Sequence, residues 1–408
     1  MPTVEEHQRD VSALLAPLAH REPELLHWSN APPASLYDRV LARELLNLID
    51  LPPFDNSQMD GYAVRARDVV AGTALAVAPR VAAGHPGPPI IAGTAVPIMT
   101  GAPMPSGADA VIPIEEATPD RFLPEGAGQA VSFTSLVPSG TFVRRRASDL
   151  AAGEVLLAAG TRLGPAQWGV IAASGITEVE LVPQTRVLVL STGDELVRVG
   201  DALGSGQVYD ANGTSLALAL TQSGALVDAV IVAPDDAARV HELIAGHDVD
   251  LIMSTGGVSK GAYEVVRDVF EELGVDFVSV AMQPGGPQGL GIAQLAHGAV
   301  PVVAFPGNPV SALVSFEIFL RPVLRRLHGL APWRPTAELP LVEPLDSPAA
   351  KYQVRRGRIN AEGEVELVGG PGSHLIHSYA ASTVLVHVPA GVSHLDAGAT
   401  VEVWRIDD

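Results

Sequence analysis

The residues best suited to chemistry in this sequence lie in a glycine-rich loop between two apolar segments. The stretch LIMSTGGVSKG, Leu251 to Gly261, joins a short apolar run to two glycines and small polar residues, and an amphipathic segment follows over 262–273. This order predicts a strand, a loop and a helix. Glycine lets a ligand approach the main chain closely, and the helix would point free N–H groups at the loop. We therefore expect the loop to bind an anion.

A second loop of the same kind follows another apolar run. In FPGNPVSALVSFEIFL, Phe305 to Leu320, the Pro306-Gly307 pair predicts a tight turn at a strand end. Asn308 is expected to cap the next helix, with Pro309 in its first position. Carboxylates accompany these loops: Asp194, Glu195, Asp210 and Glu264 are expected at one sheet edge, whereas Asp60 and Asp149 come from other segments.

These acids suggest a metal as well as helix stabilisation. Each one alone can simply favour the positive end of a helix. As a group without cysteine or an HExxH motif, they favour Mg²⁺ over zinc or copper, and Mg²⁺ beside glycine loops favours a phosphorylated substrate. No histidine stands near Ser254, Thr255 or Ser259 to act as a base, so we expect hydrogen bonds to phosphate or backbone from them. Lys260 is either a phosphate contact or an exposed lysine.

The composition excludes several classes of protein. The net charge of −20 over 408 residues argues against nucleic acid or anionic lipid as the main partner. No apolar run reaches the ~18–20 residues of a membrane span, and the polar first residues do not resemble an export signal. The lack of cysteine excludes disulfides and thiolate chemistry and fits a cytoplasmic protein. Lysine occurs only at positions 260 and 351.

The order of apolar patterns predicts a multidomain α/β protein. From residue 186, short apolar strands alternate with helices, including one at 213–223 capped by Asn212, which predicts a doubly wound, mostly parallel sheet that binds ligands at its carboxyl edge. An earlier helix is expected at 35–51. The expected domains are a mixed α/β dimerisation domain (20–52 and 141–184), an inserted all-β domain (53–140), the doubly wound domain (185–332) and a C-terminal β-barrel (336–408).

Seven motifs, in this order, carry a family resemblance. They are PPFDNSQMDGYAVR, IMTGAPMPSGADAVIPIEE, RRRASDLAAGEVLLAAGTRLGP, STGDELV, GQVYDANG, STGGVSKG and FPGNPVSAL. Together they resemble the molybdopterin molybdenumtransferase family, MoeA and the gephyrin E domain. The resemblance implies an enzyme that inserts molybdate into adenylylated molybdopterin, releases AMP and requires Mg²⁺. It also implies a homodimer whose cleft lies between the sheet domain of one subunit and the inserted domain of the other, with other molybdenum-cofactor biosynthesis proteins as possible partners.

The resemblance assigns roles to residues by motif. It implies catalytic roles for Asp60, Glu195, Asp210 and Glu264, with Asp60, Glu195 and Asp210 as metal ligands. It implies substrate contacts for Thr100, Asp149, Asn212, Ser254, Gly256, Gly257, Ser259, Lys260, Pro306, Gly307, Asn308, Ser311, Arg356 and Ser373.

The sequence departs from the family at its lysines. The family's KPGKP stretch reads Gln283-Pro284-Gly285-Gly286-Pro287 in this chain, and a lysine four residues earlier is Ser279. Those lysines help to bind anions, so a non-catalytic molybdopterin-binding scaffold is an alternative function. A molybdopterin adenylyltransferase is another, although that activity resides in a lone sheet domain.

Overall fold

The computed structural model describes residues 1–81, 84, 87–123, 128–234, 236–258, 265–296 and 298–407. It divides the chain into two compact units. The first unit comprises Met1–Glu24, Asp38–Val40 and Glu180–Asp408, and the second comprises Leu25–Tyr37 and Leu41–Val179. The division does not test the four predicted domains, whose boundaries remain predictions.

A six-stranded sheet forms the centre of the first unit, in the order β18-β15-β19-β23-β22-β20. The first four strands are parallel, and the last two pairings are antiparallel. The strands are β15 (Arg186–Thr192), β18 (Leu226–Ala233), β19 (Leu251–Thr255), β20 (Val275–Ser279), β22 (Pro287–Leu295) and β23 (Gly298–Phe305). The carboxyl ends of β15, β19 and β23 therefore meet at one edge, which is where the polar loops begin.

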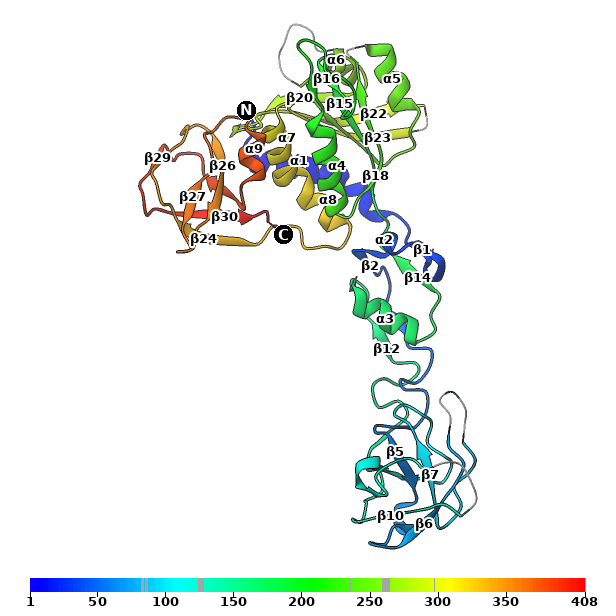
Figure 1. Ribbon diagram of the computed structural model, residues 1–408. Helices are drawn as coiled ribbons and strands as arrows, with labels where there is room; N and C mark the ends of the chain where they lie inside the picture. The colour runs from blue at the N-terminus through cyan, green and yellow to red at the C-terminus, as the bar shows by residue number, and fades with distance from the viewer. Residues whose placement is uncertain are drawn as a thin grey trace. The chain divides into compact units, whose positions relative to one another are not determined.

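Helices cover both faces of this sheet (Figure 1). Successive strand residues point to opposite faces, so Leu251 and Met253 pack against one helical layer and Ile252 against the other. The first layer holds α1 (Val4–Leu15), α4 (Ala211–Gln222), α7 (Pro309–Ser315), a π-helical turn (Phe316–Leu320) and α8 (Arg321–Leu327); the second holds α5 (Ala237–Ala245) and α6 (Val265–Glu272).

The end of the chain forms a second, smaller sheet in the first unit. Its order is β21-β26-β28-β30-β24, with β27 also paired to β26. A bridge between Leu341 and Val365 joins the end of β24 to β27, so the pairings return to β26, an arrangement compatible with the predicted barrel. The elements are β21 (Met282–Gln283), β24 (Thr336–Pro340), β25 (Leu345–Asp346), β26 (Tyr352–Ile359), β27 (Val365–Leu367), α9 (Ile376–Ala380), β28 (Val384–Val388), β29 (His394–Leu395) and β30 (Thr400–Arg405).

The second unit is built around a six-stranded sheet in the order β8-β5-β7-β6-β10-β9. Both of its faces are buried: Tyr62 of β5 lies in one apolar cluster and Ala63 in another. Its strands are β5 (Gly61–Val64), β6 (Ala74–Val77), β7 (Thr94–Ile98), β8 (Ala110–Pro113), β9 (Ala117–Thr118) and β10 (Ala130–Phe133).

The remaining α-helices and strands of the chain are β1 (Glu24–His27), α2 (Pro33–Leu36), β2 (Arg39–Val40), β3 (Leu45–Leu46), β4 (Asn56–Ser57), β11 (Val143–Arg144), β12 (Val155–Leu157), β13 (Arg162–Leu163), α3 (Pro165–Ala173), β14 (Glu178–Leu181), β16 (Leu196–Val197) and β17 (Val208–Tyr209).

The helix predicted over residues 35–51 is wrong. Only the short α2 forms, and Asp38 then adopts a φ of 59°, which a right-handed helix does not allow. The chain continues as β2 and β3, so the helical spacing of its apolar residues reflects two short strands. Conversely, residues 4–15 form a capped helix, α1, in which Thr3 accepts from the Glu6 amide. Its buried face, Val4, His7, Val11 and Leu15, packs on the sheet.

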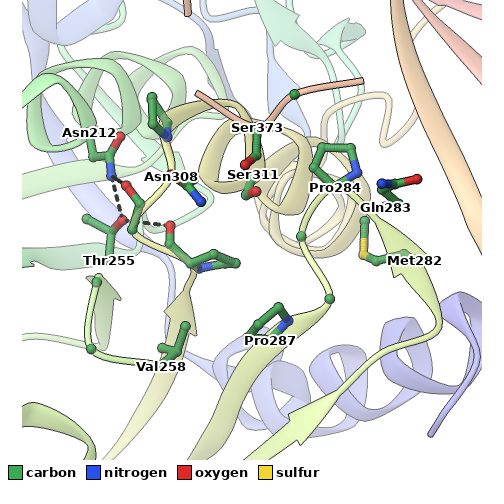
Figure 2. Close-up of a pocket in the computed structure, with 18 of the residues that line it drawn as sticks. Asn212, Thr255, Val258, Met282, Gln283, Pro284, Pro287, Asn308, Ser311 and Ser373 are labelled. Carbon is green, nitrogen blue, oxygen red and sulfur yellow. Dashed lines mark hydrogen bonds between the residues drawn. The ribbon is translucent and has the colours of Figure 1, made fainter. Parts of the chain in front are cut away.

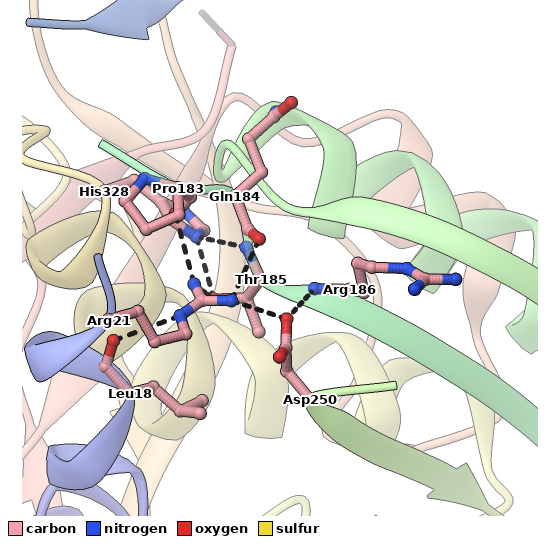
Figure 3. A network of polar contacts seen from close by, with 8 residues as sticks. All are labelled: Leu18, Arg21, Pro183, Gln184, Thr185, Arg186, Asp250 and His328. Atoms are coloured by element: carbon pink, nitrogen blue, oxygen red, sulfur yellow. Dashed lines mark hydrogen bonds and ion pairs between the residues drawn. The ribbon is translucent and has the colours of Figure 1, made fainter. Parts of the chain in front are cut away.

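A buried polar network fixes the start of β15 to the end of α8 (Figure 3). The Thr185 amide donates to His328 Nε2 (3.0 Å), so the ring proton lies on Nδ1, which donates to Ser223 O (2.8 Å). Beside it, the Arg21 guanidinium donates to Gln184 O and to the Asp250 carboxylate (2.6 Å). Burial lowers the pKa of His328 to about 4, and the nearby arginines act in the same direction. The imidazole is therefore neutral in the folded protein.

This network predicts a loss of stability in acid. The pKa of His328 is about 4 in the folded protein and 6.5 for an ordinary histidine. As the pH falls, the unfolded chain therefore binds a proton at this position before the folded protein does. The contribution of His328 to the free energy of unfolding is complete above pH 6.5. It falls by about 3 kcal/mol as the pH drops from 6.5 to 4. Chemical denaturation at several pH values should show a shallower fall for His328→Gln than for wild type. Parallel pH profiles would show that His328 is not the group responsible.

Candidate functional site

A cavity of about 970 Å³ opens at the carboxyl edge of the parallel strands in the first unit (Figure 2). Its walls come from the loops after β15, β19 and β23, from the first turn of α4, and from segments 282–287 and 371–373. This is the position where doubly wound sheets bind ligands. Nine of the residues expected to bind substrate or metal line it: Glu195, Asn212, Gly256, Gly257, Pro306, Gly307, Asn308, Ser311 and Ser373.

A hydrogen-bonded network holds the two strand-end loops together. The Asn212 amide donates to Thr255 Oγ1 (3.0 Å) and to Gly307 O (2.7 Å), as Figure 2 shows. Thr255 Oγ1 in turn donates to Pro306 O (3.2 Å), and the Gly256 amide donates to Phe305 O (3.1 Å). One side chain from α4 thus joins the ends of β19 and β23.

Glycine is required where these loops meet. Gly256 has a φ of 96°, and a Cβ on it would lie 2.5 Å from Thr192 O. A Cβ on Gly307 would lie 3.3 Å from the Gly256 Cα, so the two loops touch through their backbones. Gly193, with a φ of 146°, lets the Glu195 carboxylate fold over it, since a Cβ there would lie 2.5 Å from Glu195 Oε2. The glycines therefore leave main-chain atoms facing the cavity.

The opposite wall comes from the C-terminal region and from segment 282–287. Ser373 O accepts from the Val310 amide (3.0 Å), which docks the 371–373 loop on the start of α7, next to Ser311 (Figure 2). Gln288, fully buried, donates to Gly285 O (2.6 Å) and to Ser315 Oγ (2.8 Å). These bonds fix the Gln283–Pro287 segment at the cavity wall.

Several of the expected site residues are used differently from the prediction. Asp210, not Asn212, is the N-cap of α4: its Oδ1 accepts from the Gly213 amide (2.9 Å). Asp210 is 6% exposed and does not line the cavity. Ser254 is fully buried, because the alternation along β19 turns it to the α5 and α6 side while Thr255 faces the cavity. Asn308 makes no side-chain cap for α7.

Arg356 lies behind the cavity wall rather than on it. The side chain is 1% exposed, and its Nη2 donates to Gly370 O in the loop that leads to Ser373. Its Nε and Nη1 atoms have no hydrogen-bond partner among the described residues. Burial lowers the pKa of this guanidinium, followed by repulsion from Arg355. Two buried donors thus remain free to bind an anion that reaches them.

Other expected site residues fall outside the cavity unit. Asp60, Thr100 and Asp149 belong to the second unit. Asp60 Oδ1 accepts from the hydroxyl (2.7 Å) and amide (2.6 Å) of Thr100, and these bonds lower the Asp60 pKa. Asp149 is exposed, and two of the preceding arginines pair with acids: Arg145 with Asp55 (2.8 Å) and Arg146 with Asp50. Ser259, Lys260 and Glu264 lie outside the described residues.

Lys351 is a cavity residue that sequence reasoning missed. It precedes β26 and lines the cavity beside segment 282–287. The rarity of lysine could have pointed to Lys351, because the chain has only one other lysine, Lys260. Met282 and Gln283 also line the cavity, and their position depends on the pairing of β21 with β26, which no local pattern indicates.

The described residues do not form a protein-only metal centre. Within them, no three His, Cys, Asp or Glu side chains gather closely enough to hold a metal ion. Asp60 is in the second unit and Asp210 caps α4, so Glu195 is the one carboxylate among the described residues that line the cavity. In the same part of the chain, no helix is long and apolar enough to cross a membrane.

Three family models together match nearly the whole chain. The MoeA N-terminal region (domains I and II) matches residues 2–175, a probable molybdopterin-binding domain matches 188–326, and the MoeA C-terminal region (domain IV) matches 338–406. A molybdopterin molybdenumtransferase 2 of Mycobacterium tuberculosis is 39% identical over the full length of both chains. The chain belongs to the MoeA family. The predicted family is thereby confirmed.

Further relatives of the MoeA family agree in length and architecture. A molybdopterin molybdenumtransferase of Haemophilus influenzae is 35% identical over 90% of this chain and 91% of its own. A crystal structure of the molybdopterin biosynthesis MoeA protein of Pyrococcus horikoshii superposes with a TM-score of 0.77 at 29% identity, covering 99% and 98% of the two chains. The multidomain α/β architecture of this chain is thus that of MoeA structures.

The close approach of Gly256 to Thr192, at the end of β15, predicts an unusual sensitivity to one methyl group. Gly256→Ala should destabilise the protein more than Gly391→Ala, because Gly391 has nearly the same φ, 97°, but open space where its Cβ would lie. The strain of positive φ is common to both, so the difference isolates the clash with Thr192 O, about 1–3 kcal/mol. Denaturant unfolding of both variants measures it. Equal losses would mean that Thr192 can move away from the new methyl group at no cost in stability.

Proposed function

We propose that this protein is a molybdopterin molybdenumtransferase, which inserts molybdenum into molybdopterin during cofactor biosynthesis. In the proposed reaction, adenylylated molybdopterin and molybdate are the substrates and AMP leaves. The observation that carries the proposal is the cavity at the carboxyl edge of the sheet, lined by Gly256, Gly257, Gly307 and Asn308. Membership in the MoeA family supports the same reaction.

Main-chain amides are the proposed phosphate ligands. The backbone N–H groups of Gly257, Gly307 and Asn308 donate no hydrogen bond to another described residue. They are therefore available to the phosphate oxygens of a bound nucleotide, and Asn212 holds the loops that carry them. Such amides bind an anion without a basic side chain. This matters in a chain of net charge −20.

Glu195 is the proposed protein ligand of Mg²⁺. Protein Mg²⁺ sites often use one or two carboxylates together with substrate phosphates, and the single carboxylate among the described residues that line the cavity fits that pattern. When bound, the ion would neutralise charge on the diphosphate as the anhydride is cleaved. Asp210 follows β17, which pairs with β16 directly after Glu195. We propose that Asp210 adds negative charge near Glu195 while it caps α4.

Molybdate is proposed to bind near Ser373 and Arg356. Ser373 lines the cavity, and Arg356, behind the same loop, has two buried donors without partners among the described residues. We also propose a homodimer, as the family resemblance implies, in which Asp60, Thr100 and Asp149 of one subunit complete the cavity of the other. A cytoplasmic location and contacts with other proteins of cofactor biosynthesis belong to the same proposal.

The role of Glu195 is testable by turnover. Glu195→Gln should lower the rate of AMP release from adenylylated molybdopterin, with molybdate and Mg²⁺ present, by about tenfold or more, because the variant loses the charge that holds the ion. Asp194→Asn is a matched control, since Asp194 is the neighbouring acid but does not line the cavity. An unchanged rate in Glu195→Gln would remove this carboxylate from the mechanism.

Asp210→Asn separates charge from structure at the neighbouring position. Asparagine caps a helix as well as aspartate does, so the variant should unfold at the same denaturant concentration as wild type. If the Asp210 charge is needed, AMP release slows while stability is unchanged. Equal rates would leave Asp210 with its capping role alone. Tight binding of adenylylated molybdopterin by calorimetry, with no AMP release by wild type, would instead favour the non-catalytic scaffold.

A further inference from the structure

The wall formed by Gln283–Pro287 has no basic side chain, and its two glycines leave little room for one. A Cβ on Gly285, whose φ is 96°, would lie 2.8 Å from Ser315 Oγ. On Gly286 it would lie 3.3 Å from Val280 O, which is tight. Gln283 is held by Gln353, which donates to its Oε1 (2.8 Å). In this sequence, a positive charge at this end of the cavity therefore comes from another segment.

Lys351 supplies that charge. Among the described residues that line the cavity, it carries the only cationic side chain. Its place is fixed by the main chain on both sides: the Lys351 amide donates to Pro348 O, and the next amide, of Tyr352, donates to Ala281 O (both 2.9 Å). The parallel pairing of β21 with β26 then continues from Met282 opposite Tyr352. The lysine is thus anchored next to the wall that lacks a cation.

The ammonium group of Lys351 is available to a ligand. The side chain is half-buried and makes no ion pair with any acid in the described parts of the chain. Most other basic side chains that the structure describes already form ion pairs or hydrogen bonds. Arg358, for example, pairs with Glu366 (2.7 Å). An unpaired, half-buried ammonium on a polar cavity favours an anionic ligand, and its three donors suit oxygen atoms.

We propose that Lys351 binds a tetrahedral oxyanion in this cavity, in the role that a basic 283–287 segment would otherwise perform. The oxyanion is either molybdate or a phosphate group of the pterin nucleotide. The identity of the ligand depends on the proposed function, whereas oxyanion binding itself does not. Lys351 is therefore a specificity residue of the site, placed there from a strand of the C-terminal sheet.

Titration calorimetry on the full-length protein tests this with two probes, sodium molybdate and inorganic pyrophosphate. Lys351→Gln should weaken binding of at least one probe by about tenfold, as expected for loss of a charged hydrogen bond. Loss for molybdate alone assigns the lysine to the metal oxyanion, and loss for pyrophosphate alone assigns it to the nucleotide. Arg358→Gln controls for net charge, because Arg358 lies on β26 but does not line the cavity.

A relocated charge gives a second, independent measurement. Gln283 also lines the cavity, so Gln283→Lys combined with Lys351→Gln should recover much of the lost affinity. Equal affinities for Lys351→Gln, Arg358→Gln and wild type would overturn the proposal, as would a wild type that binds neither probe. A protein that binds oxyanions through Lys351 but releases no AMP would overturn the proposed function and leave this inference standing.

Discussion

The contact between the loops after β19 and β23 is the constraint on which the site depends. Because the two strands are parallel neighbours, both chains leave the sheet at the same edge and must pass within van der Waals distance. Glycine at 307 makes this approach possible, because a Cβ there would lie 3.3 Å from the Gly256 Cα, and Asn212 joins the loops by two hydrogen bonds. A surface of main-chain amides then faces the cavity, with its geometry set by the sheet and not by mobile side chains.

Electrostatics follow from the same arrangement. A chain with 46 acidic and 26 basic side chains has little positive charge to place around an anionic substrate. In the proposed site, backbone dipoles, the half-buried Lys351 and two donors of the buried Arg356 that have no partner among the described residues would provide the attraction that the net charge does not. Since the attraction is local, the negative surface elsewhere has little effect on it at physiological salt, where charges separated by more than about 8 Å are screened.

Much of the sheet could be predicted from the sequence, because its strands are short apolar runs bounded by glycine and by acids. β15, β18, β19, β20 and β23 overlap the short apolar runs that led to the prediction of a doubly wound sheet from residue 186. β22 was missed, since its glycines conceal the apolar pattern of residues 287–295, and the false helix at 35–51 arose from leucines that serve two separate strands. The expected cap at Asn212 was displaced by two residues, because Asp210 takes that role and frees the asparagine amide for the loops.

The pairing of β21 with β26 has a consequence for the modularity of this chain. Met282 and Gln283 leave the doubly wound region between β20 and β22 and form the edge strand of the C-terminal sheet. The boundary between the two regions is therefore not a single point near residue 335. An exchange of C-terminal regions between homologues, in evolution or by design, would have to transfer this two-residue strand as well, or leave the incoming sheet without its edge and the cavity without one wall.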